Sequence, residues 1–448
     1  MCRALRRARS SGLAFCLAVL LGAALSGCTT YGERMAAVEA AVQDGDPQRA
    51  LTLLDERPGG SGDRVVDLLN RGALLRMAGK FEASNQALEA AHNAIAEVDP
   101  LSVTEQIGSL TVGETAFAYA GAPHDRILLH LIKAFNYLDL GDSEAARVEI
   151  LRIDLRLQRL ADEQSRSAYR RDPFAHYLSG LIFEHLGEPD QALVAYRLAE
   201  QAYQEQSERL GIVVPTALQL DLLRLADAFG LDEERAQWQE RFALDDWPDP
   251  ATHRQQAHVV VISGVGLAPR RREQSTAVQD DKGRIHSIAL PYYEPRQRAV
   301  HSIELRGPEA AISAEPVHDI DAVARILLDE QQAVLVARAL ARLLVQKELI
   351  DQAREVNPAA GLAMNIFTLA ADRADTRTWG MLPARYYMAR VSLPPGEHCL
   401  ELVYRGPSNH TLNRTSLGCI ELAADTYHFI FDRWVSKRTG SVTRREGM

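Results

Sequence analysis

The first half of the chain repeats apolar residues with the period of amphipathic helices. Between residues 31 and 243, apolar positions recur three and four residues apart, and short segments with a glycine and an acidic residue interrupt them. The repeated unit consists of a helix, a turn and a second helix, with alanines at fixed offsets. Its clearest copy contains Leu68, Gly72, Leu75, Gly79, Phe81, Ser84, Leu88 and Ala91. The pattern predicts antiparallel helix pairs stacked in an array.

The spacing of this unit resembles the tetratricopeptide repeat, in which small residues allow two helices to touch. The turn glycines Gly45 and Gly79 are 34 residues apart, which is the tetratricopeptide period. The next turn glycines, Gly141, Gly187 and Gly230, follow at intervals of 62, 46 and 43 residues, which indicates insertions or longer helices. Stacked repeats curve into a concave groove that typically holds a peptide or partner protein. We therefore expect residues 28–244 to form a tetratricopeptide-like helical domain with such a groove.

A different pattern begins after the proline-containing segment 245–250. A helical pattern runs from about Ile320 to Arg354, Asn357-Pro358 interrupts it, and a second helix is expected at 362–371. We expect residues 257–435 to form an α+β domain with antiparallel strands joined by hairpins, and 436–448 to be a disordered tail. Its expected strands lie at 258–263, 284–293, 299–306, 386–393, 397–405, 416–422 and 427–434.

The N-terminal segment has the order of a secretory signal. Several arginines precede an apolar run from Leu13 to Leu25, which is shorter than the ~20 apolar residues that span a bilayer. The run ends in Leu-Ser-Gly-Cys, which resembles the bacterial lipobox. We therefore expect residues 1–27 to be removed and Cys28 to carry acyl chains such as palmitate, with an ordinary signal and a chance cysteine as the alternative. Thr29, in place of an aspartate, points by the same resemblance to the outer membrane.

Charge and cysteine content narrow the classes of function. The formal net charge is −10, and loss of the four arginines in residues 1–27 leaves −14, which argues against nucleic-acid binding. Cys399 and Cys419 lie outside the signal, with Asn409 midway between them in a turn-rich segment. A hairpin there would place the two cysteines opposite each other. This predicts a disulfide in an oxidising compartment, and two free thiols are the alternative.

Two segments contain candidate binding residues. The loop 111–126 is rich in glycine and aromatic residues, and loops on a rigid scaffold often bind partners. Its candidates for partner contact are Phe117, Tyr119 and His124, with packing as the alternative. The segment 372–390 is the possible second-domain site, and a loop-fixing ion pair with a core tryptophan is the alternative. Its candidates are Asp375, Arg377, Trp379 and Arg390.

Catalytic and metal signatures are missing from the sequence. No G-x-S-x-G, H-E-x-x-H or C-x-x-C motif occurs, and the histidines do not cluster at metal-ligand spacing. We therefore expect no catalytic residue, no metal and no cofactor. Residues 270–272 are three consecutive arginines. They could bind an anionic polymer or a lipid headgroup, and a solvated turn is the alternative.

Two longer segments resemble a known family. Residues 115–126 with 131–149, and residues 374–398, resemble an uncharacterised family of tetratricopeptide-containing outer-membrane lipoproteins of Gram-negative bacteria. The resemblance covers nearly the whole mature chain. Genes of this family often lie near those for lipoprotein activators of penicillin-binding proteins, which implies a role in the cell envelope.

These observations lead to two hypotheses about function. The first is a non-enzymatic, lipid-anchored and periplasm-facing scaffold of the outer membrane that holds an envelope protein or peptide through its helical repeats. The second is an enzyme or binding protein that acts on cell-wall glycan or another envelope polymer through the C-terminal domain.

Overall fold

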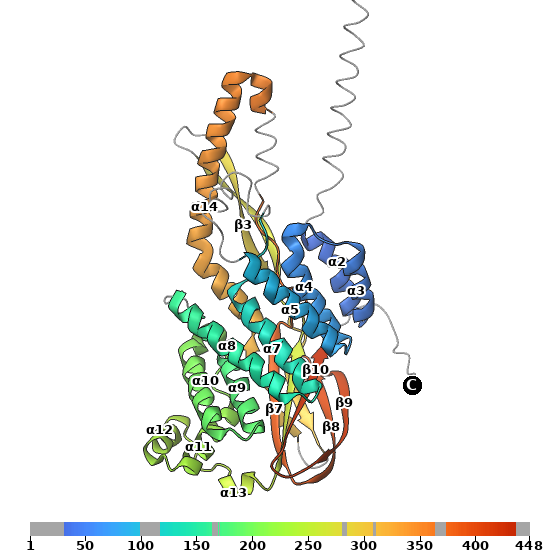
Figure 1. The fold of residues 1–448 in the computed structure, drawn as a ribbon, viewed down its shortest axis with the longest axis vertical. Helices are drawn as coiled ribbons and strands as arrows, with labels where there is room; N and C mark the ends of the chain where they lie inside the picture. The colour runs from blue at the N-terminus through green and yellow to red at the C-terminus, as the bar shows by residue number, and fades with distance from the viewer. Residues whose placement is uncertain are drawn as a thin grey trace, which may run out of the picture.

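A computed structural model describes residues 31–98, 117–163, 169, 171–279, 285–307, 311–362 and 373–435. The expected signal segment 1–27, the lipidation site Cys28 and the tail 436–448 lie outside these residues, as does most of the second helix expected at 362–371. The described chain forms a curved array of helices, followed by sheets and one long helix (Figure 1).

The helical half is built from antiparallel helix pairs, as the periodicity predicted. Each turn glycine identified in the sequence has a positive φ, between 66° at Gly230 and 80° at Gly45. A side chain is strained in that conformation, which explains why glycine occupies these turns. The helices are α2 Tyr31–Gln43, α3 Pro47–Glu56, α4 Arg64–Met77, α5 Phe81–Val98, α7 Pro123–Asp139, α8 Ser143–Glu163, α9 Pro173–His185, α10 Pro189–Leu210, α11 Thr216–Phe229, α12 Asp232–Phe242 and α13 Pro250–His253.

The small residues of the repeat bring paired helices into close contact. A Cβ atom at Gly180 in α9 would lie 2.1 Å from Cε1 of Tyr196 in α10, and one at Gly72 in α4 would lie 2.5 Å from Cδ2 of Leu88 in α5. Neither distance leaves room for a methyl group. In these two pairs, a large residue on the second helix therefore fills the space that glycine leaves on the first.

The second half contains two four-stranded sheets and a long hairpin. One sheet has the order β10-β1-β7-β6, the other β5-β4-β8-β9, and β2 pairs with β3. The pairing is antiparallel as expected, except that β1 and β10 run parallel, which the sequence analysis did not predict. The strands are β1 Ala257–Val265, β2 Arg270–Gln279, β3 Ile285–Glu294, β4 Ser302–Arg306, β5 Ala311–Ser313, β6 Glu315–Asp319, β7 Arg385–Leu393, β8 Gly396–Arg405, β9 Thr411–Leu422 and β10 Tyr427–Trp434.

Strand β1 joins the two halves of the molecule, because it is buried on both faces. Val259 and Val261 face the second sheet and pack with Leu402 and Tyr404 of β8. Val260 and Ile262, on the other face, belong to the same hydrophobic core as the helices. The continuous apolar run in the sequence is what burial on both faces requires.

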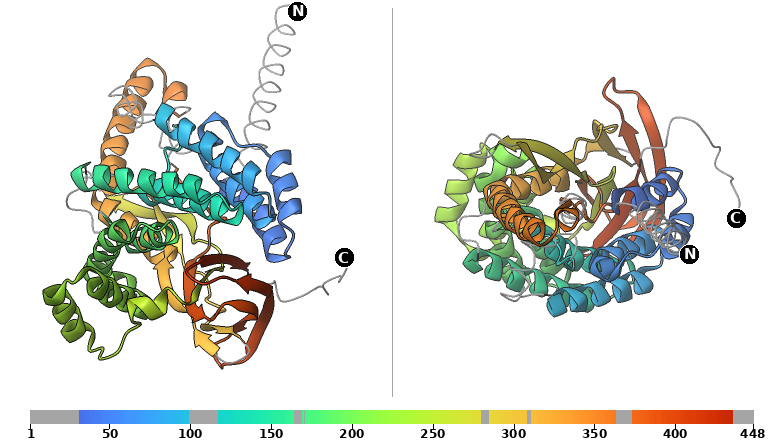
Figure 2. Two further views of the ribbon diagram at one scale, coloured as in Figure 1. Left: turned by 60° about the horizontal axis from the view of Figure 1, so that its bottom comes forward. Right: turned by 90° about the horizontal axis from the view of Figure 1, so that it is seen from above.

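The array of helices wraps around this central sheet (Figure 2). Helix α7 packs on β10, and α9 packs on β6. One continuous hydrophobic core includes buried residues of both halves, from Met35 in α2 to Tyr427 in β10. The helical domain and the α+β domain therefore share a core and form one structural unit.

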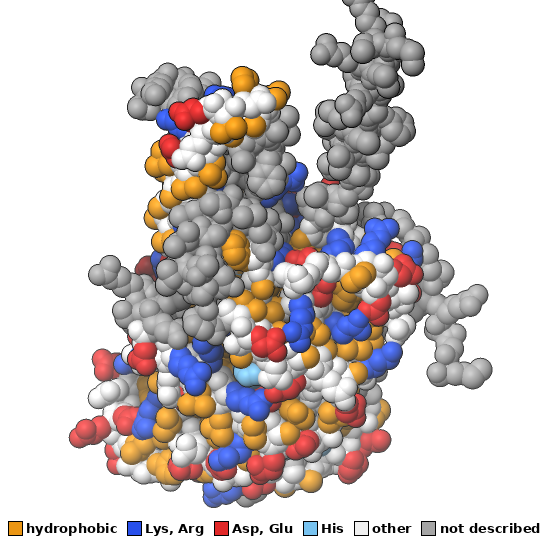
Figure 3. Space-filling model, turned by 45° about the horizontal axis from the view of Figure 1, so that its top comes forward, with side chains coloured by type: hydrophobic (Ala, Val, Ile, Leu, Met, Phe, Trp, Pro, Cys, Tyr) orange, Lys and Arg blue, Asp and Glu red, His pale blue; other side chains and the backbone are white. Residues whose placement is uncertain are grey.

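A long helix projects from this body beside the β2-β3 hairpin (Figure 1). It is α14, Ile320–Val356, and Asp319 caps it by accepting from the backbone N–H of Ala322 at 2.9 Å. Apolar side chains gather along its projecting part (Figure 3), where Val334 and Leu344 are exposed. No described helix, α14 included, is apolar enough over a sufficient length to cross a bilayer.

The predicted disulfide is present. Cys399 in β8 and Cys419 in β9 are directly paired in the hairpin, with their Cα atoms 3.9 Å apart, and their sulfur atoms are bonded. Asn409 lies at the turn with a φ of 58°, which asparagine tolerates better than most residues. The position of the turn midway between the cysteines was the feature that predicted this pairing.

Candidate functional site

The concave face of the helical array is filled by the protein's own sheet. Phe135 of α7 contacts Tyr386 of β7 and Phe431 of β10, with ring centroids 5.7 and 4.5 Å apart. Phe174 of α9 stacks on Tyr386 at 5.6 Å. In α10, the hydroxyl of Tyr203 donates to the carbonyl of Val317 in β6 at 2.8 Å. The expectation of an open peptide groove is therefore wrong for this conformation, because intramolecular packing covers that face.

Arg390, one of the candidate second-domain residues, belongs to this internal interface. Its guanidinium forms a buried ion pair with Asp221 of α11 and donates to the hydroxyl of Tyr177 at 3.1 Å. Burial alone would lower the pKa of Arg390, but the Asp221 carboxylate outweighs burial and raises it. Arg390 is thus a tie between sheet and array, and it also lines a pocket of about 350 Å³ beside α11 and β6.

Arg377 clamps another segment of the second half to the array. Its Nη1 donates to the carbonyls of Gly62 and Phe117 at 2.9 and 2.8 Å, and its Nη2 pairs with Asp375 at 2.9 Å. Trp379 is buried close by in the shared core. Asp375, Arg377 and Trp379 therefore fix the junction, as the structural alternative held. They form no common site with Arg390, which has its partners on α9 and α11.

The loop residues expected to contact a partner lie mostly inside the molecule. Phe117 is half-buried, whereas Tyr119 and His124 are 7% and 5% exposed. The hydroxyl of Tyr119 donates to Asp125 at 2.6 Å, and the Arg377 guanidinium lies over its ring. Tyr119 and His124 are therefore not available to a partner in this conformation. The two segments that carry the family resemblance instead contact each other.

His124 belongs to a buried polar cluster at the N-terminal ends of α7 and α9. Its Nε2 lies 3.5 Å from Asp125, and His318 Nδ1 lies 3.8 Å from Asp172. Burial lowers the pKa of His124. Among the described residues no group of His, Cys, Asp and Glu side chains has the arrangement of a metal site.

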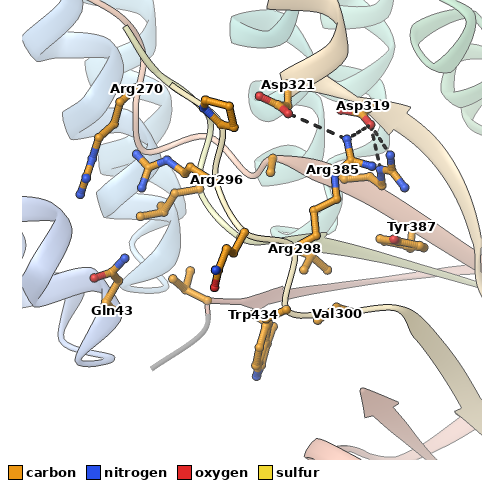
Figure 4. A pocket seen from close by; sticks show the side chains of 18 of the residues that line it. Gln43, Arg270, Arg296, Arg298, Val300, Asp319, Asp321, Arg385, Tyr387 and Trp434 are labelled. Carbon is orange, nitrogen blue, oxygen red and sulfur yellow. Dashed lines mark hydrogen bonds and ion pairs between the residues drawn. The ribbon is translucent and has the colours of Figure 1, made fainter. Parts of the chain in front are cut away.

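A cleft with several charged residues lies between α2 and the second domain (Figure 4). We call it the charged cleft, and its volume is about 420 Å³, within the range of small-ligand sites. Strand β2, the β3–β4 connection, the start of α14 and β7 supply its charged residues. They are Arg270, Glu294, Arg296, Arg298, Asp319, Asp321 and Arg385.

Two buried carboxylates organise the arginines of the charged cleft. Glu39 of α2 accepts from Arg270 Nε at 2.7 Å and from Arg296 Nη2 at 3.0 Å. Asp319 accepts from Arg298 Nη2 at 3.1 Å and from Arg385 Nε at 3.0 Å, as Figure 4 shows. The bonds to Glu39 raise the pKa of Arg270. Each carboxylate thus fixes two guanidinium groups. The exposed Arg298 can offer its remaining donors to a ligand, whereas Nε of Arg296 is buried.

The charged cleft presents charges of both signs to solvent, because Glu294, whose side chain is 41% exposed, lines it together with the arginines. The side chains of Arg298 and Arg270 are 58% and 37% exposed, whereas Glu39 and Asp319 are buried beneath them. Among the described residues that line it there is no serine, cysteine, histidine or lysine. Asp319 is already committed to two arginines and to the cap of α14. The arrangement suits binding of an anionic group and offers no activated nucleophile.

Sequence reasoning found only part of this cleft. The arginine run 270–272 was identified as a possible anion site, and of its members Arg270 lines the cleft. Glu39, Arg296, Arg298 and Arg385 were not singled out. A local signal existed in the Arg-x-Arg spacing of Arg296 and Arg298, but nothing in the sequence places Glu39 against them.

Comparison with known proteins adds little to this picture. No family model matches the sequence, and no curated relative does. Two crystal structures of MamA are 14% and 15% identical, each with a TM-score of 0.28 over 48% of this chain and 94% and 96% of theirs. A further structure, MamA MSR-1 C2, is 13% identical with a TM-score of 0.26, over 47% of this chain and 96% of its own. Likeness at this level assigns no function, so the function has to be argued from the site.

Proposed function

We propose that the protein is a non-enzymatic, lipid-anchored scaffold of the Gram-negative cell envelope that binds an acidic segment of a partner protein in the charged cleft. The observation that carries this proposal is the pairing of four arginines around two buried carboxylates at an accessible junction. A guanidinium held in place loses little conformational freedom when it binds a carboxylate, which favours affinity and orientation.

The helical array has a different task in this proposal from that of an open groove. Its concave face holds the central sheet, and its first helix, α2, supplies Glu39 to the cleft. The array thus positions one wall of the binding site against the other. The convex face of the array is then the face that would contact other proteins, as expected of a scaffold.

The expected anchor fits the position of the cleft. Tyr31 begins α2 and lies three residues after Cys28, so a lipid on Cys28 would lie within about 11 Å of it even with the connection fully extended. The hydroxyl of Tyr31 donates to the carbonyl of Thr378 at 2.7 Å, which ties this end of the helix to the second domain. Lipidation would therefore hold the start of α2 close to the membrane surface, and the far end of the same helix, at Gln43, lines the cleft.

Photo-crosslinking in intact cells tests the proposal. A photoreactive residue at Gln297, an exposed residue that lines the cleft, should yield a specific adduct with a partner, identified by mass spectrometry. The matched control carries the same probe at Gln201, which is exposed on α10. Equal adduct patterns from the two positions would contradict the proposal.

A charge reversal sharpens the same experiment. Arg298→Glu should abolish the Gln297 adduct, because it places a carboxylate at the entrance of the cleft. Arg414→Glu is the control, since Arg414 is 53% exposed on β9 and pairs only with Glu401 at the surface. Loss of the adduct in both variants would indicate a global charge effect and count against the cleft.

Binding of an anionic envelope polymer is the second candidate. It is favoured by the open shape of the cleft and by Tyr387 and Trp434, which line it beside the arginines. Co-sedimentation with isolated cell-wall polymer measures it directly, and Arg298→Glu should reduce the bound fraction. Asp375 and Arg377, which we expected to carry such activity, act at the internal junction instead.

A further inference from the structure

A second cavity lies between the helical array and the central sheet. Its volume is about 340 Å³, and it shares no lining residue with the charged cleft. Helices α4 and α7 form one wall, and β1, β7 and β10 form the other. Aromatic and apolar side chains supply most of its surface, among them Phe81, Phe135, Tyr386, Phe431 and Met381.

One of the two arginines in this cavity is fully occupied by the protein. Arg76 donates to Asn136 at 2.6 Å and pairs with Asp139 at 2.8 Å. Its guanidinium also lies over the rings of Phe81 and Phe431, at 5.4 and 4.9 Å from their centroids. Arg76 is therefore part of the wall, with its charge balanced by Asp139.

Arg433 of β10 is the other arginine, and its charge is not balanced. Its Nη1 donates to the carbonyls of Gly264 and Trp434 at 3.1 and 3.2 Å. Its Nε and Nη2 are buried and have no hydrogen-bond partner among the described residues, and no described carboxylate forms an ion pair with it. The neighbouring carboxylate of Asp432 accepts from the hydroxyl of Tyr404 instead.

A buried guanidinium in this condition is costly. Buried donors without partners are rare in folded proteins, and a buried charge without a counter-charge loses its hydration without compensation. Burial lowers the pKa of Arg433 to about 10, so the side chain remains protonated at neutral pH. The protein thus carries a positive charge at the wall of this cavity. Asp432 acts on it electrostatically, but no described carboxylate forms an ion pair with it.

The unpartnered atoms have a specific geometry. The Nε and Nη2 donors of an arginine point in parallel from one edge of the planar group, which matches the two oxygens of a carboxylate. The two donors lie behind the cavity wall, so a ligand would meet them when the guanidinium turns toward the cavity. The adjoining aromatic walls would take an apolar group attached to that carboxylate.

We propose that this cavity binds a carboxylate attached to an aromatic or aliphatic group, with Arg433 as its counter-charge. Two sources have this chemistry, the C-terminal residue of a peptide and a free aromatic or aliphatic acid. The proposal is independent of the charged cleft and of lipidation, because the two cavities share no lining residue and Cys28 lines neither.

Calorimetric titration of the purified protein tests the proposal with three probes. N-acetylphenylalanine represents a peptide C-terminus, 3-phenylpropanoate represents a free acid, and N-acetylphenylalanine amide lacks the carboxylate. We expect saturable binding of at least one acid and at least tenfold weaker binding of the amide. Tighter binding of N-acetylphenylalanine would identify a peptide terminus as the source, and tighter binding of 3-phenylpropanoate a free acid. Absence of binding by both acids, or equal binding of acid and amide, would overturn the proposal.

Variants connect the binding to Arg433. Arg433→Gln should abolish binding of the acids, and Arg433→Lys should weaken it at least tenfold, because lysine keeps the charge but lacks the paired donors. Arg414→Gln, at an exposed surface pair on β9, should bind as the unchanged protein does. Undiminished binding by Arg433→Gln would place the ligand elsewhere. The comparison of acid with amide uses the unchanged chain, so it decides the proposal even if the Arg433 variants do not fold.

Discussion

Arg390 and Arg433 lie on the same sheet and face the same helical array, yet only Arg390 has an ion-pair partner among the described residues. Arg390 on β7 meets the carboxylate of Asp221 and the hydroxyl of Tyr177. Arg433 on β10 meets two backbone carbonyls and no carboxylate among the described residues. Burial disfavours the charged form of both side chains. Asp221 reverses this effect for Arg390, and nothing in the described chain reverses it for Arg433.

The difference separates residues that hold the protein together from residues that are free to bind. A buried ion pair contributes little net stability, but its partners become necessary because either alone would be an unpaired buried charge. Arg390 and Asp221 are in that position. Arg433 is already unpaired, so the protein tolerates a cost there that a ligand would relieve. Stability measurements should therefore rank these arginines differently.

The largest effect is expected from Asp221→Asn. The variant keeps the shape of the side chain but removes the carboxylate that pairs with Arg390. Arg390 would then be a buried arginine without an ion-pair partner, as Arg433 already is. Breaking a buried pair on one side costs about 3–5 kcal/mol of unfolding free energy. Denaturant unfolding monitored by circular dichroism measures it.

Two controls accompany this variant. Asp190→Asn, at an exposed site on α10, should change the free energy of unfolding by less than about 0.5 kcal/mol. The double variant Asp221→Asn with Arg390→Met should recover part of the loss, because it removes the unpaired charge. If the double variant were no more stable than Asp221→Asn, the cost would not lie in the charge of Arg390.

How much of this arrangement the sequence predicts depends on the range of the contacts. The helix pairs follow from local periodicity, and Gly180 and Gly72 are glycines because a neighbouring helix lies against them. The disulfide follows from a turn midway between Cys399 and Cys419. Each of these features is determined by residues close in the chain or by a regular repeat.

The candidate sites could not be predicted in the same way. Glu39 and Arg296 in the charged cleft are joined only by the packing of α2 against the second domain. Tertiary packing also fills the concave face of the array. The sequence of an amphipathic helix does not reveal this, because its pattern is the same whether its apolar face covers a sheet or a partner. Tyr119 was expected to be an exposed loop residue, because its local sequence does not show the long-range packing that buries it.

A smaller effect than that of Asp221→Asn is expected from Arg377→Met. Arg377 lies at the same interface but is tied to two carbonyls and to Asp375, which lies at the edge of the core. Hydrogen bonds to a charged group contribute about 1.5–3 kcal/mol, so we expect a loss of about 2–3 kcal/mol. Thermal or denaturant unfolding measures it, with Arg414→Met as the exposed control. A loss as small as that of the control would mean that the clamp is dispensable.

The surroundings of Arg390 also predict a dependence of stability on pH. The rings of His253 and His258 stack at 3.7 Å beside this ion pair. Burial first, and then the charge of Arg224, lowers the pKa of His253 to about 3, while burial and then Arg390 lower that of His258 to about 4. Both groups are neutral in the folded protein and have a pKa of about 6.5 when unfolded.

The sign of this dependence follows from the lowered values. The unfolded chain binds protons that the folded chain excludes, so stability is complete above about pH 6.5 and declines as the pH falls toward about 4. Unfolding at pH 7 and pH 5 should show this decline in the unchanged protein, and less of it in His253→Gln with His258→Gln. His410→Gln, at an exposed turn residue, should leave it unchanged. An equal decline in all three proteins would assign the effect to other groups.

The smallest effect is expected from Arg433→Met, and it is the most informative for the comparison. The substitution removes two hydrogen bonds from Nη1, each contributing about 1 kcal/mol, but it also removes a buried charge that has no partner. The two effects oppose each other, so the free energy of unfolding should change by no more than about 1 kcal/mol under ligand-free conditions. A loss of about 3–5 kcal/mol, as for Asp221→Asn, would show that Arg433 is a structural tie like Arg390. The small effect would instead leave ligand binding as the reason for a charge in that place.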